Sequence, residues 1–303
     1  MGARLIETSI TRMFGLRYPI IGAPMFLISD VAMLKAMGEA GMMGVMPALN
    51  CRSTEALRVA IRTLREAAVP FGINLILLEN PRLEADLTVC LEARVPLIVT
   101  SLGNPSGLIV RARAAGVRVF CDVVSLRHAQ KAAEAGADAL VAVGAGAGGH
   151  AGVISPFVLV PYLRRKLSIP IVAAGGIADG QTLAAALALG ADAAYMGTRF
   201  IASTEAPVGD DYKRALIESG PENIVYTAEV TGHPANFLEL SVERYRLLRE
   251  AGESAGKRWR DVWSAGQTVG LIEAVQPTAT IVAEIVEEYE RVRRSLPPLQ
   301  PDA

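Results

Sequence analysis

The chain has 303 residues, 51% of them hydrophobic, and its 30 basic and 31 acidic side chains leave a formal net charge of −1. That length suits one large barrel or two smaller domains. The near-neutral balance removes the electrostatic reason to expect a nucleic acid or an anionic membrane as partner. No apolar run approaches the roughly 20 residues that span a bilayer, and residues 1–11 do not resemble a secretory signal.

Three cysteines, Cys51, Cys90 and Cys121, are odd in number and widely spaced. The sequence holds no CxxC pair and no Cys/His cluster, so we expect no metal site and predict buried, reduced and inert thiols. Reduced thiols and the missing secretory signal together favour the cytoplasm.

Eight short apolar runs are typical of fully buried strands. Their starts lie about 20 to 30 residues apart, which is the length of one strand–helix unit. The expected strands are residues 19–22, 44–47, 71–75, 96–100, 117–122, 139–143, 169–174 and 193–197.

The segments between these runs have the periodicity of amphipathic helices. Gly41, Gly116, Gly136 and Gly190 each close such a segment just before a strand, where Gly supplies the left-handed residue that stops a helix. Buried strands that alternate with helices form a parallel sheet, and eight units favour a closed (β/α)8 TIM barrel of the α/β class. The alternative, an open doubly wound sheet, would want a GxGxxG turn after the first strand, where GAPMF stands.

The regular alternation of strands and helices ends after the eighth strand. Residues 205–262 contain two helix-like segments and a Pro- and Gly-marked stretch, TGHPANF. Because they follow the last strand, we expect a mainly helical insertion at the catalytic end of the barrel, where it covers the active site. The expected division is residues 1–204 for the ligand-binding barrel, 205–262 for the insertion, and 263–303 for the return to the barrel and a final helix.

Two glycine-rich loops follow the seventh and eighth strands. The first, AAGGIADG, contains Gly175 and Gly176, and the second, MGTRF, contains Gly197 and Thr198. Barrels often bind phosphate at these two loops, where exposed backbone N–H groups and the positive end of a short helix converge. The glycines allow close backbone approach and the threonine adds a hydroxyl, so we predict a phosphate site.

The loop after the sixth strand, GAGAGGHAG, has Gly at five of nine positions and His150 near its centre. Such a bare loop lets a large flat ligand lie against the backbone, and an imidazole there can move a proton near neutral pH. We therefore predict a catalytic role for His150. His128 falls within a helix and is expected to be structural or exposed, while a site role for His233 is left open.

Two further segments offer ligand contacts. The residues Ala23, Pro24 and Met25 after the first strand are small or flexible and can support an aromatic ring, although Met in a core is the commoner interpretation. Asn74 is a polar residue inside an otherwise apolar strand. If buried it needs a hydrogen-bond partner, which a ligand would supply.

The motifs PIIGAPM, FGINL, GAGGHAG, AAGGIADG and GADAAYMGTRF, in this order and spacing, resemble the nitronate monooxygenase family, formerly called 2-nitropropane dioxygenases. The resemblance covers nearly the whole chain. It implies FMN in the barrel mouth and His150 as the catalytic residue. By motif match, the implied FMN contacts are Ala23, Pro24, Met25, Asn74, Ala147, Gly148, Gly149, Gly175, Gly176, Gly197 and Thr198.

Some positions depart from the family pattern. Family members often carry Gln or Glu where Val143 stands and Glu where Gly146 stands. Some relatives have Lys near the flavin where this chain has Asp122, and a carboxylate in that place changes the charge beside the flavin. Gln267 matches a Gln in related tails and is expected near the site.

The resemblance implies a flavoprotein oxidoreductase that oxidises alkyl nitronates with O2 to carbonyl compounds and nitrite. The same scaffold includes FMN-dependent enoyl-acyl-carrier-protein reductases and NADH:quinone reductases, so an alternative is an NAD(P)H-dependent reductase. A non-catalytic flavin-binding protein is the third reading. The implied partners are a small-molecule substrate and O2, and the sequence leaves a homodimer open.

Overall fold

The computed structural model describes residues 5–251 and 262–295. Residues 252–261 of the expected insertion and residues 296–303 of the expected last segment lie outside the described residues.

Eight parallel strands close into the predicted barrel, in the order β1-β2-β3-β4-β5-β6-β8-β9. Every neighbouring pair is parallel, including β1 with β9, which closes the ring. The strands are β1 Ile20–Gly22, β2 Met43–Pro47, β3 Phe71–Ile76, β4 Leu97–Ser101, β5 Arg118–Val123, β6 Ala139–Val143, β8 Ile171–Ala174 and β9 Ala193–Met196.

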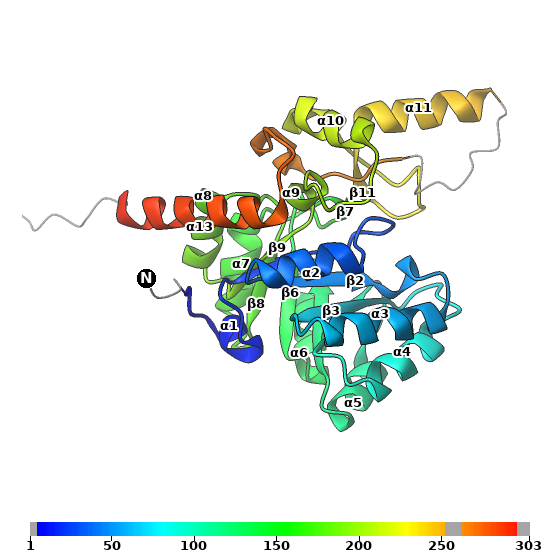
Figure 1. Cartoon of the computed structure of the whole chain (residues 1–303), viewed down its shortest axis with the longest axis vertical. Coiled ribbons are helices and arrows are strands. Elements are labelled where there is room, and N and C mark those ends of the chain that lie inside the picture. The colour runs from blue at the N-terminus through cyan, green and yellow to red at the C-terminus, as the bar shows by residue number, and fades with distance from the viewer. Residues whose placement is uncertain (1–4, 252–261, 296–303) are drawn as a thin grey trace, which may run out of the picture.

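Helices return the chain from one strand to the next around the outside of the barrel (Figure 1). These are α2 Val31–Glu39, α3 Thr54–Glu66, α4 Leu83–Glu92, α5 Ser106–Ala114, α6 Leu126–Ala135, α7 Pro156–Arg164 and α8 Gly180–Ala188, with the short η1 Ala48–Asn50 before α3. The four predicted stop glycines, Gly41, Gly116, Gly136 and Gly190, have φ of 93°, 72°, 92° and 100°. Each has the left-handed conformation that a side chain would strain.

The inside of the barrel is filled by apolar side chains that point inward from alternate positions of the strands. This cluster includes Ile21, Met43, Val99, Phe120, Val141 and Val172. The helix α1 Ser9–Phe14 adds Ile10 to the same cluster and lies at the end of the barrel away from α10 and α11 (Figure 1). This closing helix was not predicted from the sequence.

The segment after β9 begins with the short α9 Thr198–Ile201 and continues as α10 Asp210–Glu218, η2 Pro221–Asn223, β10 Ile224–Thr227, β11 Ala235–Leu238 and α11 Glu239–Glu250. It contains helices, as expected, but also a β-hairpin. The hairpin pairs antiparallel with β7 Gly149–His150, a two-residue strand in the loop after β6. The insertion is therefore attached through main-chain pairing to the loop that carries His150.

The chain then returns through η3 Gln267–Leu271 to the last helix, α13 Thr278–Ser295, which lies along α8 (Figure 1). The two helices pack closely, and only glycine fits at Gly180 of α8, where a Cβ would lie 2.4 Å from the carbonyl oxygen of Ile285 of α13. Among the described residues no helix is both long enough and apolar enough to cross a bilayer.

Candidate active site

A cavity of about 1880 Å³ opens where the barrel strands end and the insertion begins. All twelve residues that the sequence assigns to the site line it: Ala23, Pro24, Met25, Asn74, Ala147, Gly148, Gly149, His150, Gly175, Gly176, Gly197 and Thr198. Asp122 and His233 line it too. Residues up to 175 positions apart in the chain thus meet in one space, at the end of the barrel where such enzymes have their active sites.

The glycine-rich loops form one wall of the cavity, which we call the glycine rim (residues 144–152, 175–176 and 197–198). Its parts pack closely against one another. A Cβ on Gly175 would lie 2.9 Å from the carbonyl oxygen of Ala145, and one on Gly148 would lie 3.1 Å from the hydroxyl oxygen of Thr198. Gly176 differs, because φ is 72° and a Cβ there would meet no atom within 4 Å. Its open side faces the cavity, where a ligand can approach the backbone.

Segments from the insertion and the tail hold the loop after β6 in place. The Asn236 amide nitrogen donates a hydrogen bond of 2.7 Å to the carbonyl oxygen of Ala147. The backbone N–H of Gln267 donates to the carbonyl oxygen of Gly146 at 3.0 Å, so the main chain of the tail also holds this loop. The Tyr226 hydroxyl donates to the carbonyl oxygen of Ala151 at 3.1 Å. A glycine-rich loop loses much conformational entropy on ordering, and these bonds offset that cost.

The imidazole of His150 lies in β7, beside the ring of His233, with 6.1 Å between ring centroids and an edge-to-face angle of 67°. Burial, and secondarily the charge of His233, lowers the pKa of His150 below its ordinary 6.5. His150 is therefore neutral at pH 7 and able to accept a proton. The pairing of β7 with β11 explains the meeting of the two histidines, since His233 directly precedes the Pro234–Ala235 entry to β11.

The loop after β1 is fixed by a residue that the sequence analysis missed. The Asn50 amide nitrogen donates to the carbonyl oxygens of Met25, at 3.0 Å, and Ser29, at 2.7 Å. Its amide oxygen accepts from the backbone N–H of Leu27 at 2.8 Å, a residue with a left-handed φ of 63°. One side chain thereby satisfies three backbone groups and sets where Met25 enters the cavity.

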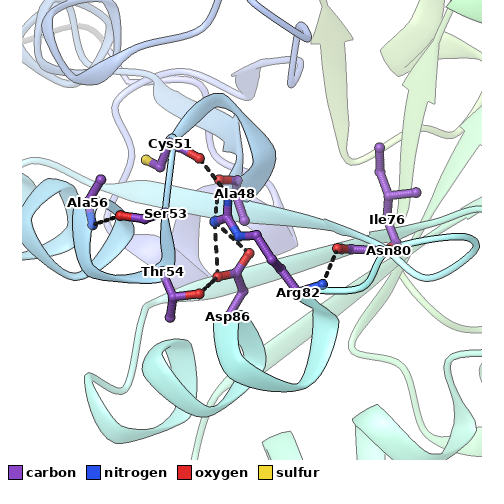
Figure 2. Close-up of polar contacts among 9 residues, drawn as sticks. All are labelled: Ala48, Cys51, Ser53, Thr54, Ala56, Ile76, Asn80, Arg82 and Asp86. Atoms are coloured by element: carbon purple, nitrogen blue, oxygen red, sulfur yellow. Dashed lines mark hydrogen bonds and ion pairs between the residues drawn. The ribbon is translucent and has the colours of Figure 1, made fainter.

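An ion pair between the partly exposed Arg82 and a buried carboxylate fastens the neighbouring loops after β2 and β3 (Figure 2). Arg82 donates to both carboxylate oxygens of the fully buried Asp86, at 2.9 and 3.1 Å, and to the carbonyl oxygen of Cys51 at 2.7 Å. The Thr54 hydroxyl completes the carboxylate shell at 2.6 Å. A buried pair is weak evidence for stability, but removing one partner strands a charge and typically costs about 3–5 kcal/mol.

Inward-facing polar side chains form the bottom of the cavity, which we call the polar floor (Asn74, Ser101, Asp122 and Tyr195). The Asn74 amide nitrogen donates to the Ser101 hydroxyl at 2.8 Å and to the carbonyl oxygen of Val99 at 3.1 Å. The Ser101 hydroxyl donates to Asp122 Oδ2 at 2.5 Å. Both amide protons of Asn74 are used inside the protein, so Asn74 offers a ligand its carbonyl oxygen.

Burial strongly perturbs the two acids of the polar floor. It raises the pKa of Asp122 to about 7, against the lowering effect of the Ser101 hydrogen bond. It also raises the pKa of Tyr195 well above its usual value, with the charge of Asp122 adding to the effect. Asp122 Oδ1 and the Tyr195 hydroxyl are buried and have no hydrogen-bond partner among the described residues. Tyr195 and Ser101 were missed because an inward-facing residue in a short strand carries no distinctive sequence pattern.

The three cysteines are free thiols, and one of them, Cys121, lines the cavity next to Asp122. Burial raises the pKa of Cys90 to about 12 and that of Cys121 to about 11, and it raises the pKa of Cys51 despite the nearby charge of Arg82. Protonated thiols are poor nucleophiles, in agreement with the prediction of inert cysteines. His128 is exposed at the edge of the cavity.

A closed (β/α)8 barrel with a deep cavity at the carboxyl ends of its strands, a glycine rim and a neutral imidazole defines a barrel enzyme. The model of the nitronate monooxygenase family matches residues 82–243. A nitronate monooxygenase of Pseudomonas aeruginosa is 32% identical over 75% of this chain and 78% of its own length. A Rhodococcus jostii (3aS,4S,5R,7aS)-5-hydroxy-7a-methyl-1-oxo-octahydro-1H-indene-4-carboxyl-CoA dehydrogenase is 30% identical over 83% of this chain and 70% of its own length.

Among solved structures, FabK from Thermotoga maritima superposes with a TM-score of 0.86 and 34% identity, over 96% of this chain and 98% of that one. A nitroalkane oxidase from Streptomyces ansochromogenes superposes with a TM-score of 0.82 and 27% identity, over 95% and 99% of the two chains. The chain belongs to the nitronate monooxygenase family and is an oxidoreductase. Membership of this family implies a flavin cofactor.

Proposed function

We propose that this protein is an FMN-dependent monooxygenase that oxidises alkyl nitronates with O2 to carbonyl compounds and nitrite. The observation that carries the proposal is the presence of a neutral, half-buried His150 in the same cavity as the glycine rim. The family match and the likeness to a nitroalkane oxidase support the reaction class.

The residues of the cavity fit a phosphorylated flavin. Gly176 presents bare backbone with open space beside it, and the Thr198 hydroxyl, which accepts from the N–H of Gly266 at 2.9 Å, still has its own proton to donate. These two residues, with Gly175 and Gly197, would hold the phosphate. The ring would lie among Ala23, Pro24, Met25, Asn74, Ala147, Gly148 and Gly149, which line the same cavity.

When bound, FMN supplies the electron-transfer chemistry of the reaction. The protein binds and orients the substrate, excludes water and moves a proton. His150 Nε2 or Nδ1 would accept the proton from the carbon next to the nitro group of a neutral nitroalkane, which yields the nitronate. Because the pKa of His150 is lowered, its base form persists to a pH below 6.5. The resulting imidazolium would then stabilise the negative charge of the nitronate at short range.

The second candidate function is NAD(P)H-dependent reduction of an enoyl thioester or a quinone. The observation that favours it is the cavity volume of about 1880 Å³, because ligand pockets typically measure about 300–1,000 Å³. A flavin and a small nitronate leave space in such a cavity, whereas a nicotinamide nucleotide or an acyl thioester would fill it. The likeness to FabK and to a CoA-ester dehydrogenase supports this alternative.

One anaerobic experiment separates the two functions. Purified protein is reconstituted with FMN and mixed separately with propionate 3-nitronate, NADH and NADPH, while the flavin absorbance is followed by stopped flow. Rapid reduction by the nitronate, followed by nitrite release on admission of O2, supports the monooxygenase. Rapid bleaching by a pyridine nucleotide with no response to the nitronate overturns it in favour of the reductase. A colourless protein that takes up no flavin contradicts both.

A further inference from the structure

The polar floor contrasts with the rest of the barrel interior. Along β5, Phe120 faces inward in the apolar cluster, and two residues later Asp122 faces the same way. The same change takes place along β4, from Val99 to Ser101. Residues two positions apart on a strand face the same side of the sheet. Asp122 and Ser101 therefore point into the barrel, as Phe120 and Val99 do. At the bottom of the cavity, four inward positions that could hold apolar side chains hold Asn74, Ser101, Asp122 and Tyr195 instead.

Hydrogen bonds across three neighbouring strands hold this level rigid. Asn74 of β3 donates to Ser101 of β4, and Ser101 donates to Oδ2 of Asp122 on β5. The chain of donors ends at a carboxyl whose other oxygen, Oδ1, is buried and unpartnered among the described residues. A buried polar atom without a partner destabilises the folded protein. Such a cost in a cavity wall indicates a group held ready for a ligand.

Tyr195 of β9 supplies a second atom of this kind. Its hydroxyl is buried and unpartnered among the described residues, although the rest of the ring packs in the apolar cluster. It is close enough to Asp122 for the charge of that carboxyl to influence its pKa. Two polar atoms from well-separated strands therefore meet the same space, and neither satisfies the other.

No described cation approaches this pair. The Arg52, Lys131 and Arg244 side chains that line the cavity are all exposed at its outer edge. The groups that interact with Asp122 are Ser101 of β4, which donates a hydrogen bond to it, and Tyr195 and Cys121, whose pKa values its charge raises. None of the three carries a positive charge. Without a counter-ion, an apolar environment keeps a carboxyl protonated, and a protonated carboxyl donates a hydrogen bond.

We propose that the polar floor binds the flavin ring through Asp122 and Tyr195, with the neutral carboxyl of Asp122 as a hydrogen-bond donor whose ionisation sets the charge beside the ring. The inference rests on the proposed function, because it places a flavin in this cavity. It adds two binding residues and one controlling charge to the site, and it holds for either of the two candidate reactions.

The consequence is a flavin whose redox behaviour follows the protonation of one carboxyl. Reduction adds electron density to the ring. A neutral donor beside the ring stabilises that density, whereas a carboxylate at the same place opposes it through a medium of low dielectric constant. The pKa of Asp122 is raised to about 7, so the flavin should become harder to reduce as the pH rises through this value.

The test compares the FMN-loaded wild type with Asp122→Asn, Tyr195→Phe and Asp210→Asn. Asp122→Asn keeps the shape and a donor but cannot ionise. Asp210→Asn is the matched control, since Asp210 is exposed at the start of α10 and does not line the cavity. The readouts are the reduction potential of the flavin and its dissociation constant, both measured from about pH 5 to about pH 9.

We expect the potentials of wild type and Asp122→Asn to agree at the acidic end and to separate above about pH 7, with the wild type lower. Asp210→Asn should follow the wild type throughout. Tyr195→Phe should weaken FMN binding about 5-fold, the value of one hydrogen bond. If the variants bind FMN like the wild type and all potentials run parallel with pH, the inference is wrong while the proposed function stands. A wild type that binds no flavin refutes both.

Discussion

The glycine rim and the polar floor face each other across one cavity, but they are constructed in opposite ways. The rim presents backbone. At Gly148 and Gly175 its parts approach one another so closely that an added Cβ would lie about 3 Å from its neighbour, and other segments hold the rim from outside. The floor presents side chains, one from each of four strands, and holds itself through the hydrogen bonds of Asn74, Ser101 and Asp122.

The rim and the floor therefore supply different properties of the site, the rim its binding shape and the floor its titratable charge. Backbone N–H groups carry fixed partial charges that do not titrate, so a phosphate held by the rim is held alike at every pH near neutrality. The floor carries a carboxyl whose pKa is raised to about 7 by burial. Binding therefore belongs mainly to the rim, and pH control to the floor.

We expect the greatest change in turnover from substitution of His150, the one titratable side chain of the rim. His150→Ala should retain FMN and lose about 10²- to 10⁴-fold in turnover of neutral nitroalkanes, the usual contribution of a general base. Preformed nitronate needs no deprotonation and should lose less. The matched variant is His233→Ala, which removes the neighbouring exposed ring. Steady-state kinetics with both substrates measure the effects, and equal losses in the two variants would remove the assignment of His150 as base.

The pH dependence of the same reaction has a definite sign. The pKa of His150 is lowered, so the base form predominates at pH 7 and is lost as the pH falls through a value below 6.5. The rate with neutral nitroalkanes should therefore decline on the acid side, and a decline that begins above pH 7 would have to be assigned to Asp122 instead.

The second effect concerns stability, and it distinguishes the floor from the rim. The folded protein holds a proton on Asp122 up to about pH 7, whereas the unfolded chain releases it near 3.8. The folded state thus binds more protons between these values, and its stability declines as the pH rises through that window. The shift of about three pH units corresponds to at most about 4 kcal/mol.

Asp122→Asn should therefore raise the free energy of unfolding, with little gain near pH 4 and the full gain above pH 7. Urea unfolding of the flavin-free protein at several pH values measures it. Asp210→Asn, at an exposed position, should show no such trend. A gain for Asp122→Asn that is independent of pH would mean that the carboxyl has the same pKa in the folded and the unfolded protein.

A third prediction uses the two adjacent glycines of the rim, which share the left-handed conformation but differ in surroundings. Gly175→Ala places a Cβ 2.9 Å from a backbone oxygen, while Gly176→Ala places it in open space. Both variants carry the backbone strain of about 1 kcal/mol, and Gly175→Ala should lose a further 1–3 kcal/mol or so from overpacking. Gly176→Leu should instead weaken FMN binding and leave the unfolding free energy near that of Gly176→Ala. Calorimetry and flavin titration separate the two outcomes.

Much of the fold and of the rim could be predicted from the sequence, because both depend on local sequence patterns. All eight barrel strands lie where the apolar runs indicate, and the four stop glycines have the expected φ. The loops of the rim can be identified from their high glycine content alone. The floor could be predicted only in part, since Asn74 is visible as a polar residue in a strand but Tyr195 and Ser101 are not.

What could not be predicted are contacts between distant segments. β7 has two residues and no apolar run, and it becomes a strand only because β11, about 85 residues later, pairs with it. The same holds for the hydrogen bond from Asn50 to the loop after β1, and for the hydrogen bond from Arg82 to the carbonyl oxygen of Cys51. In each case a side chain or short segment satisfies backbone groups far along the chain, and no local pattern records that.

The smallest expected effects come from the two side chains of the insertion that fasten the rim. Asn236 is buried, and its 2.7 Å bond to the carbonyl oxygen of Ala147 lies next to the β7–β11 pairing. Tyr226 is 44% exposed, so water can replace its 3.1 Å bond to the carbonyl oxygen of Ala151. Asn236→Ala should cost about 1 kcal/mol and Tyr226→Phe about 0.5 kcal/mol or less. Because these bonds order the loop that carries His150, Asn236→Ala should also speed hydrogen exchange at the Gly149 and His150 amides, while the floor strands keep their protection. Faster exchange throughout the barrel would show instead that Asn236 supports the whole fold, and the separation between a rim held from outside and a floor that holds itself would fail.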